Sequence, residues 1–219
     1  MDASGHLKLS RSKLDLFVNC PRCFWMELRG KSPPIDMPMG LYNVLDSVQK
    51  QYYDKHRKDG LPPLLRKEIP FKLADIGLVE KLRSGIHFKD DRLNATLWGK
   101  MDDCFVDDKG RLVVMDNKTS SSGRNEDYEE GYKLQLDTYA FLLIKNGFKV
   151  GPAGYLIYYI PKKDSDIGKG VMFDIEPSRI RLDPGRIEGV FEDAVKIARK
   201  EEPPEHHHEC EMCTWIKNL

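Results

Sequence analysis

Apolar residues recur every three or four positions in several stretches of the chain, the spacing expected on one face of an α-helix. In residues 40–56, for example, Leu41, Val44, Leu45, Val48 and Tyr52 follow this spacing. A helix is also expected to begin at Ser10 or Ser12, since a serine hydroxyl is a good helix cap. The other helices predicted in this way cover residues 74–83, 126–145 and 184–200.

Shorter apolar runs predict β-strands between these helices. Residues 64–73 alternate between polar and apolar, and Pro70 would place that strand at a sheet edge or a bulge. Two further strands are expected near residues 153–160 and 171–175. Residues 98–119 predict a hairpin, because two β-type runs flank a turn-forming cluster that ends at Gly110.

Charged residues at the ends of this hairpin suggest a chemical site. Asp116 and Lys118 are two positions apart after an apolar run, so a strand would direct both to one face. Asp102 would lie across from Asp116, at about 5 Å. Two carboxylates that close repel unless a cation or a proton lies between them, and Mg²⁺ prefers carboxylate oxygens. The alternative is an ordinary Asp116–Lys118 salt bridge, with Asp102 and Asp103 in solvent.

Such a site suits phosphodiester hydrolysis. The metal would activate a water molecule and neutralise charge on the phosphate. Lys118 would position the nucleophile or stabilise the charge that develops on the phosphate.

Three short motifs follow one another in the chain. They are formed by Gly99 and Asp102, then by Asp116, Lys118 and Thr119, and then by Gln135 and Tyr139. Their order resembles that of the RecB-like branch of the PD-(D/E)XK nuclease superfamily, which has G-x-x-D, then D/E-x-K-T, then Q-x-x-x-Y. The resemblance implies an α/β, restriction-endonuclease-like core with a mixed central sheet flanked by helices, in a single nuclease domain of residues 1–219. It also implies that Gln135 orients water or phosphate and that Tyr139 supports it.

One feature of these nucleases is missing from the predicted helix at residues 40–56. Many members carry a metal-binding His there, in a G-x-x-x-H pattern, whereas Val44 stands four residues after Gly40. Asp46 or His56 could substitute for the missing His, but neither is predicted to be a ligand.

The chain has five cysteines, and four of them form two CxxC pairs. The pairs are Cys20 with Cys23 and Cys210 with Cys213, whereas Cys104 is expected to be a buried, small apolar residue. The spacing lets both thiolates of a pair reach the same metal, and the two pairs together give four sulfur ligands. A shared metal centre in residues 8–30 and 203–219 would then join the two ends of the domain. The resemblance implies a four-iron four-sulfur cluster, although related nucleases usually supply one upstream and three downstream cysteines. Paired CxxC motifs describe a four-thiolate Zn²⁺ site equally well.

Composition limits the possible partners. Lys and Arg together number 35, as do Asp and Glu, so the formal net charge is zero and a DNA contact must come from a local basic patch. The clearest such patch is Lys162, Lys163 and Lys169. The sequence has no apolar run of membrane-spanning length and no signal peptide, which predicts a cytoplasmic protein without membrane contact.

Together these features predict a Mg²⁺- or Mn²⁺-dependent deoxyribonuclease, specifically an exonuclease. Compact nucleases of CRISPR adaptation and nuclease domains of recombination helicases resemble it, which implies a role in DNA repair, recombination or CRISPR adaptation and a helicase or CRISPR protein as partner. The absent helix His and the zero net charge support an alternative: a catalytically inactive nuclease-fold module, stabilised by zinc, that binds nucleic acid or protein. RNA processing is a third option.

Overall fold

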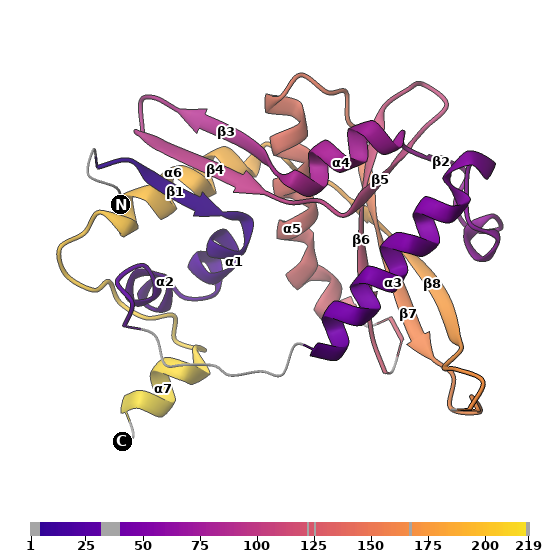
Figure 1. Ribbon diagram of the computed structural model, residues 1–219. Coiled ribbons are helices and arrows are strands. Elements are labelled where there is room, and N and C mark those ends of the chain that lie inside the picture. Colours follow the sequence, from indigo (N-terminus) through magenta and orange to yellow (C-terminus); the bar gives the residue numbers. More distant parts are fainter. Residues whose placement is uncertain (1–4, 32–39, 122, 125, 167, 218–219) are drawn as a thin grey trace. The chain divides into compact units, whose positions relative to one another are not determined.

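The computed structural model describes residues 5–31, 40–121, 123–124, 126–166 and 168–217 (Figure 1). The chain divides into two compact units. The first unit takes its residues from 1–37, 87–99 and 185–219, and the second from 38–86 and 100–184.

The second unit is built on a mixed five-stranded sheet in the order β2-β5-β6-β7-β8. β6 and β7 run parallel, and the other neighbouring strands are antiparallel. The strands are β2 (Lys72–Leu73), β5 (Asp103–Val106), β6 (Leu112–Thr119), β7 (Ala153–Pro161) and β8 (Phe173–Arg181).

Helices of the second unit pack against this sheet. On one face, Tyr53 of α3 (Gly40–His56) belongs to the apolar cluster that also contains Val113 and Met115 of β6. On the other face, Leu136 of α5 (Glu126–Lys145) meets Gly154 of β7. The remaining helical segments of this unit are η1 (Arg57–Asp59), η2 (Pro63–Leu65) and α4 (Ile76–Ser84).

The first unit contains a three-stranded sheet in the order β1-β4-β3. β1 and β4 are parallel, and Ser10 pairs with Trp98. Trp25 of this unit donates its indole N–H to the carbonyl of Lys200 at 2.9 Å. The elements are β1 (Leu7–Ser10), α1 (Arg11–Asn19), α2 (Pro21–Glu27), β3 (Ile86–Asp90), β4 (Ala95–Gly99), α6 (Arg186–Ala198) and α7 (Glu211–Lys217).

Most predicted elements are confirmed, which supports the α/β fold class. The helix predicted at residues 40–56 has those bounds, and the first helix begins after Ser10, whose hydroxyl accepts a hydrogen bond from the N–H of Lys13. The hairpin turn closes where Gly110 takes a φ of +70°, a conformation that glycine adopts readily. The predicted buried position of Cys104 is also confirmed, and burial raises the pKa of its thiol to about 12.

The strand predicted at residues 64–73 is wrong, because only Lys72 and Leu73 are extended in a sheet. Leu61, Leu65 and Ile69 are the buried apolar residues here, and their spacing of four is that of turns and helices. The N–H of Ile69 accordingly donates to the carbonyl of Leu65 at 2.9 Å.

The predicted start of the hairpin is also wrong. Trp98 lies in β4, which pairs with β1 in the first unit, so the hairpin strand begins only at Asp103. Pairing with residues 7–10 is a contact distant in the sequence, and the local pattern of residues 98–106 contains no sign of it.

Among the described helices, none combines the length and the apolar character needed to cross a membrane.

Candidate active site and cysteine cluster

The candidate active site lies where β6 ends, on the face of the sheet that α5 covers. Met115 of β6 pairs with Tyr155 of β7, so these two side chains point to one face of the sheet. Side chains alternate along a strand, so Asp116, Lys118 and Gly154 lie on the other face. On that face Leu136 of α5 contacts Gly154. β5 and β6 pair Asp103 with Met115. Asp102 directly precedes β5 and lies one residue outside this pairing.

Asp116 and Lys118 form one hydrogen-bonded network with two residues of α5. Lys118 Nζ lies 2.7 Å from Asp116 Oδ2 and 2.9 Å from Gln135 Oε1. Gln135 Nε2 donates to Asp116 Oδ1 at 2.6 Å and lies 3.4 Å from the hydroxyl oxygen of Tyr139. Asp116 is 8% exposed and Gln135 is 6% exposed, so the amide of Gln135 holds the carboxylate and the ammonium group in fixed positions.

Tyr132, which is not part of the three sequence motifs, also contacts Lys118. Lys118 Nζ lies 3.8 Å from the centre of the Tyr132 ring, a position in which the ring attracts a cation. Tyr132 precedes Gln135 by three residues, so both project from one side of α5. This helical spacing was the available signal in the sequence.

Asp102 is held by a different set of residues. Lys50 Nζ lies 2.8 Å from Asp102 Oδ1 and 2.7 Å from Asp46 Oδ2, which gathers both carboxylates around one ammonium group. Burial lowers the pKa of Lys50, but the two carboxylates outweigh this effect and raise it. Asp46, one of the two residues that could substitute for the missing His, therefore shares Lys50 with Asp102. The other, His56, contacts Asp59 instead, with 3.6 Å between His56 Nδ1 and Asp59 Oδ2.

The backbone next to Asp102 is fixed by a buried ion-pair network. Asp103 is 1% exposed, and its two carboxylate oxygens accept hydrogen bonds from Arg57 at 3.1 and 2.5 Å. Arg83 donates to the carbonyl oxygen of Asp102 at 2.8 Å and pairs with Asp54, which also binds Arg57. Burial raises the pKa of Asp103 despite the neighbouring Arg57. Asp103 is thus buried, in contrast to the solvated position that the salt-bridge alternative assumed.

A chain of hydroxyl groups supports β6 from the opposite face. Tyr159 donates its hydroxyl to that of Tyr53 at 2.7 Å, and Tyr53 donates to Asn117 Oδ1 at 2.9 Å. Tyr53 is fully buried, and burial raises the pKa of its hydroxyl well above the ordinary value. Asn117 lies between Asp116 and Lys118 in the sequence. The hydrogen bonds from Tyr159 to Tyr53 and from Tyr53 to Asn117 therefore fix the strand segment that carries both residues.

Replacement of Tyr53 by Phe is expected to lower the free energy of unfolding by about 1–3 kcal/mol, because Asn117 and Tyr159 lose a buried hydrogen-bond partner. Chemical denaturation measures this loss. Tyr42 on the same helix is 56% exposed, so Tyr42→Phe is the matched control and should change stability little. Equal stability of both variants would contradict a structural role for the hydroxyl chain.

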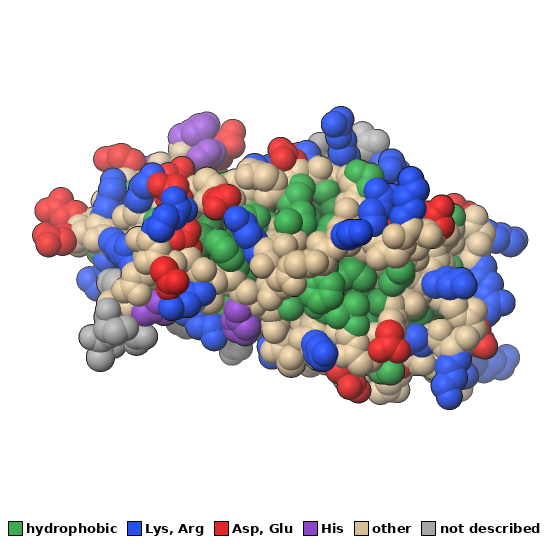
Figure 2. All heavy atoms as spheres, turned by 90° about the horizontal axis from the view of Figure 1, so that it is seen from above, with side chains coloured by type: hydrophobic (Ala, Val, Ile, Leu, Met, Phe, Trp, Pro, Cys, Tyr) green, Lys and Arg blue, Asp and Glu red, His purple; other side chains and the backbone are tan. Residues whose placement is uncertain are grey.

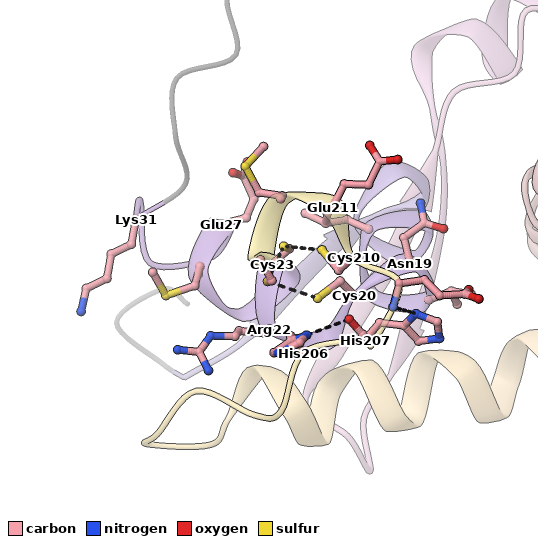
Figure 3. A pocket seen from close by; sticks show the side chains of 16 residues that line it. Asn19, Cys20, Arg22, Cys23, Glu27, Lys31, His206, His207, Cys210 and Glu211 are labelled. Atoms are coloured by element: carbon pink, nitrogen blue, oxygen red, sulfur yellow. Dashed lines mark hydrogen bonds between the residues drawn. The ribbon is translucent and has the colours of Figure 1, made fainter. Parts of the chain in front are cut away.

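The four paired cysteines come together in the first unit. Their sulfur atoms all lie within 4.8 Å of one another. Among the residues that the structure describes, they form the one group of three or more His, Cys, Asp or Glu side chains placed to hold a metal. Figure 3 shows Cys20, Cys23 and Cys210 turned toward one another in a pocket. Burial raises the pKa of a thiol, but for Cys20 hydrogen bonds from the backbone of Cys23 and His207 outweigh it and lower the pKa to about 7.

The predicted basic patch is partly neutralised. Lys162 Nζ lies 2.8 Å from Asp174 Oδ1, and Lys169 Nζ lies 3.3 Å from Asp166 Oδ2. Figure 2 shows Lys and Arg side chains scattered over the visible face, with Asp and Glu among them. Nucleic-acid binding by Lys162, Lys163 and Lys169 therefore stays a prediction.

Comparison with known proteins identifies the family. A family model described as the PD-(D/E)XK nuclease superfamily matches residues 38–217. The chain belongs to this superfamily. A search of curated proteins gives no match. Among solved structures, the protein in "Crystal structure of SSO0001" is similar in fold, with a TM-score of 0.51 and 18% identity over 90% of this chain and 78% of that one.

Membership in the PD-(D/E)XK superfamily supports a nuclease that uses a divalent metal. The carboxylate oxygens of Asp102 and Asp116 are ligands of the type that hard divalent cations prefer. In the structure each of these carboxylates contacts a lysine ammonium group. The motif residues Asp116, Lys118, Gln135 and Tyr139 form one network, whereas the side chain of Asp102 binds Lys50.

Proposed function

We propose that this protein is a metal-dependent deoxyribonuclease, an exonuclease that hydrolyses phosphodiester bonds in DNA. The observation that carries the proposal is the Asp116–Lys118–Gln135 network near the end of β6, in a chain of the PD-(D/E)XK superfamily. Asp116 and Gln135 are buried in it. A carboxylate, an ammonium group and an amide in direct contact combine a metal ligand with a donor for phosphate charge.

Asp102 and Asp116 would hold the Mg²⁺ or Mn²⁺ ion. When bound, that ion supplies a polarised phosphate and a water molecule that is easier to deprotonate. Lys118 stabilises negative charge on the phosphate or positions the attacking water. Gln135 keeps the Lys118 ammonium group and the Asp116 carboxylate in place through its two amide atoms, and Tyr139 supports Gln135.

DNA is the proposed substrate because the motif order resembles that of RecB-like DNA nucleases. Lys162, Lys163 and Lys169 are the proposed contacts with the phosphate backbone, which basic side chains bind without regard to sequence. The same resemblance supports a role in DNA repair, recombination or CRISPR adaptation. With a net charge of zero, a helicase or CRISPR protein as partner would supply additional positive surface.

A second candidate function is a nuclease-fold module that binds nucleic acid or protein without cleaving it. Two observations favour it: the helix that carries a His in many relatives has Val44, and both proposed metal-binding carboxylates contact lysines. Binding that survives Asp116→Ala, together with metal at the cysteines and none at the aspartates, would distinguish this module from the enzyme. An RNA substrate would be recognised by cleavage of RNA in the same assay.

The first test measures cleavage of linear DNA with Mn²⁺, with Mg²⁺ and with EDTA, for the wild type and Asp102→Asn. We expect cleavage by the wild type with either metal and none with EDTA. Asp102→Asn should reduce the rate at least tenfold, because it removes a charge from the metal site. Asp91→Asn is the matched control, since the Asp91 side chain is 83% exposed in the first unit. Cleavage that persists in EDTA would contradict the proposal.

A further inference from the structure

The separations between the cysteine sulfurs indicate what kind of metal centre they hold. The Sγ atoms of Cys20 and Cys213 are 3.8 Å apart. The Sγ atom of Cys23 lies 3.6 Å from Cys210 Sγ and 3.5 Å from Cys213 Sγ. Four thiolates around one tetrahedral Zn²⁺, with Zn–S bonds of about 2.3 Å, have sulfur atoms about 3.8 Å apart. These three separations match edges of a coordination tetrahedron around one ion, and all four sulfurs lie within 4.8 Å of one another.

A four-iron four-sulfur cluster does not fit the same four atoms. In a cubane cluster each cysteine binds a different iron, and the irons occupy separate corners. The cysteine sulfurs must then lie well apart, with four irons and four sulfides between them. Here the sulfurs of Cys23 and Cys213 are already in contact, so the iron–sulfur cluster implied by the family resemblance disagrees with the geometry.

The two CxxC pairs also present their sulfurs in the same way. Cys20 directly precedes α2 and Cys210 directly precedes α7, while Cys23 and Cys213 lie in the first turn of these helices. The backbone carbonyl of the first cysteine in each pair accepts a hydrogen bond from the N–H four residues further on. Phe24 donates to Cys20 and Thr214 donates to Cys210, both at 3.0 Å. Each pair is therefore folded by its own helix into a bidentate unit, and two such units complete a set of four ligands.

The neighbouring histidines have other partners. His206 Nδ1 contacts the carbonyl oxygen of His207 at 2.8 Å, and that oxygen accepts the backbone N–H of Cys210 at 3.0 Å. His207 thus fixes the position of Cys210 through its backbone. Within the described part of the chain, the metal-ligating group contains the cysteines alone.

We infer that Cys20, Cys23, Cys210 and Cys213 hold a single tetrahedral Zn²⁺ ion instead of an iron–sulfur cluster. Four thiolates leave no open coordination position, which is typical of a structural zinc site. Zn²⁺ has no redox chemistry, so the site joins the two ends of the first unit and takes no part in electron transfer. The inference concerns this unit only and does not rest on the proposed nuclease activity.

The test is the metal content of the full chain, expressed with iron and zinc both supplied and purified without oxygen. Elemental analysis should give one zinc per chain, with no acid-labile sulfide and no broad visible absorption. About four irons and four sulfides per chain, with brown colour, would overturn the inference, and a single iron in place of zinc would also overturn it.

Two variants assign the metal to these residues. Cys213→Ser should reduce the zinc content at least tenfold, whereas Cys104→Ala, at the cysteine outside the cluster, should keep one zinc per chain. If Cys213→Ser fails to fold, Co²⁺ exchanged into the wild type gives the same information. Absorption bands of tetrahedral Co²⁺ with thiolate ligands support the inference, and their absence overturns it. A DNA-cleavage assay on the same preparation reports separately on the proposed function.

Discussion

Replacement of Lys118 by Met is expected to lower kcat for DNA cleavage by about 10²–10³-fold, the usual cost of removing one group that stabilises charge in a transition state. Lys118 contacts both Asp116 and Gln135, so its ammonium group is fixed before substrate binds. Methionine keeps much of the packing of the side chain and removes the charge. KM should change much less than kcat, because the phosphate charge that Lys118 is proposed to stabilise increases in the transition state.

Steady-state cleavage with Mn²⁺ measures this effect, and circular dichroism confirms that the variant is folded. Lys196→Met is the matched control, since Lys196 lies on α6 of the first unit, 62% exposed and paired with Glu192 and Asp193. The control should cleave at the wild-type rate. A Lys118→Met variant that retains most of its kcat would remove Lys118 from the catalytic residues.

Replacement of Arg57 by Met is expected to lower the free energy of unfolding by about 3–5 kcal/mol, because it leaves a buried carboxylate without its main partner. Asp103 is 1% exposed and receives two hydrogen bonds from Arg57. Because burial raises the pKa of Asp103, the free energy of unfolding depends on pH. A folded-state pKa above the unfolded value means that stability is lost as pH rises through the folded pKa. The loss in Arg57→Met should therefore shrink as the pH is lowered.

Urea denaturation at several pH values measures this loss. Lys89→Met removes an ion pair whose partners are 64% and 83% exposed, so it should cost less than about 1 kcal/mol. Adding Asp103→Asn to Arg57→Met should recover part of the stability, because the uncompensated charge is removed. If Arg57→Met is as stable as Lys89→Met at neutral pH, the buried pair is not what holds the Asp102 segment.

Much of the second unit could be predicted from local sequence patterns. Helical periodicity located α3 and α5, and the turn at Gly110 located the β5–β6 hairpin. Asp116 and Lys118 are neighbours on one strand, so their common face follows from the alternation of side chains along a strand. These features depend on residues close together in the chain, which is why a single sequence reveals them.

Features that depend on distant residues were not predictable in this way. The pairing of Trp98 with Ser10, the ion pair of Lys50 with Asp102 and the ion pair of Arg57 with Asp103 each join segments far apart in the chain. The composition of the segments does not encode which partner each will meet. The identity of the metal at the cysteines could not be predicted for a different reason. CxxC spacing suits both zinc and iron–sulfur sites, and only the distances between the sulfur atoms distinguish the two.

The most direct test of the account is cleavage of end-labelled DNA with Mn²⁺ by the wild type and by Asp116→Asn. Asparagine keeps the size of the side chain and its contact with Gln135 but removes the charge that would bind the metal. We predict that the wild type shortens DNA progressively from an end and that Asp116→Asn, equally folded, leaves it intact. Equal cleavage by both proteins, or none by either while both are folded and supplied with Mn²⁺, would contradict the proposal that this chain is a metal-dependent nuclease acting through Asp116.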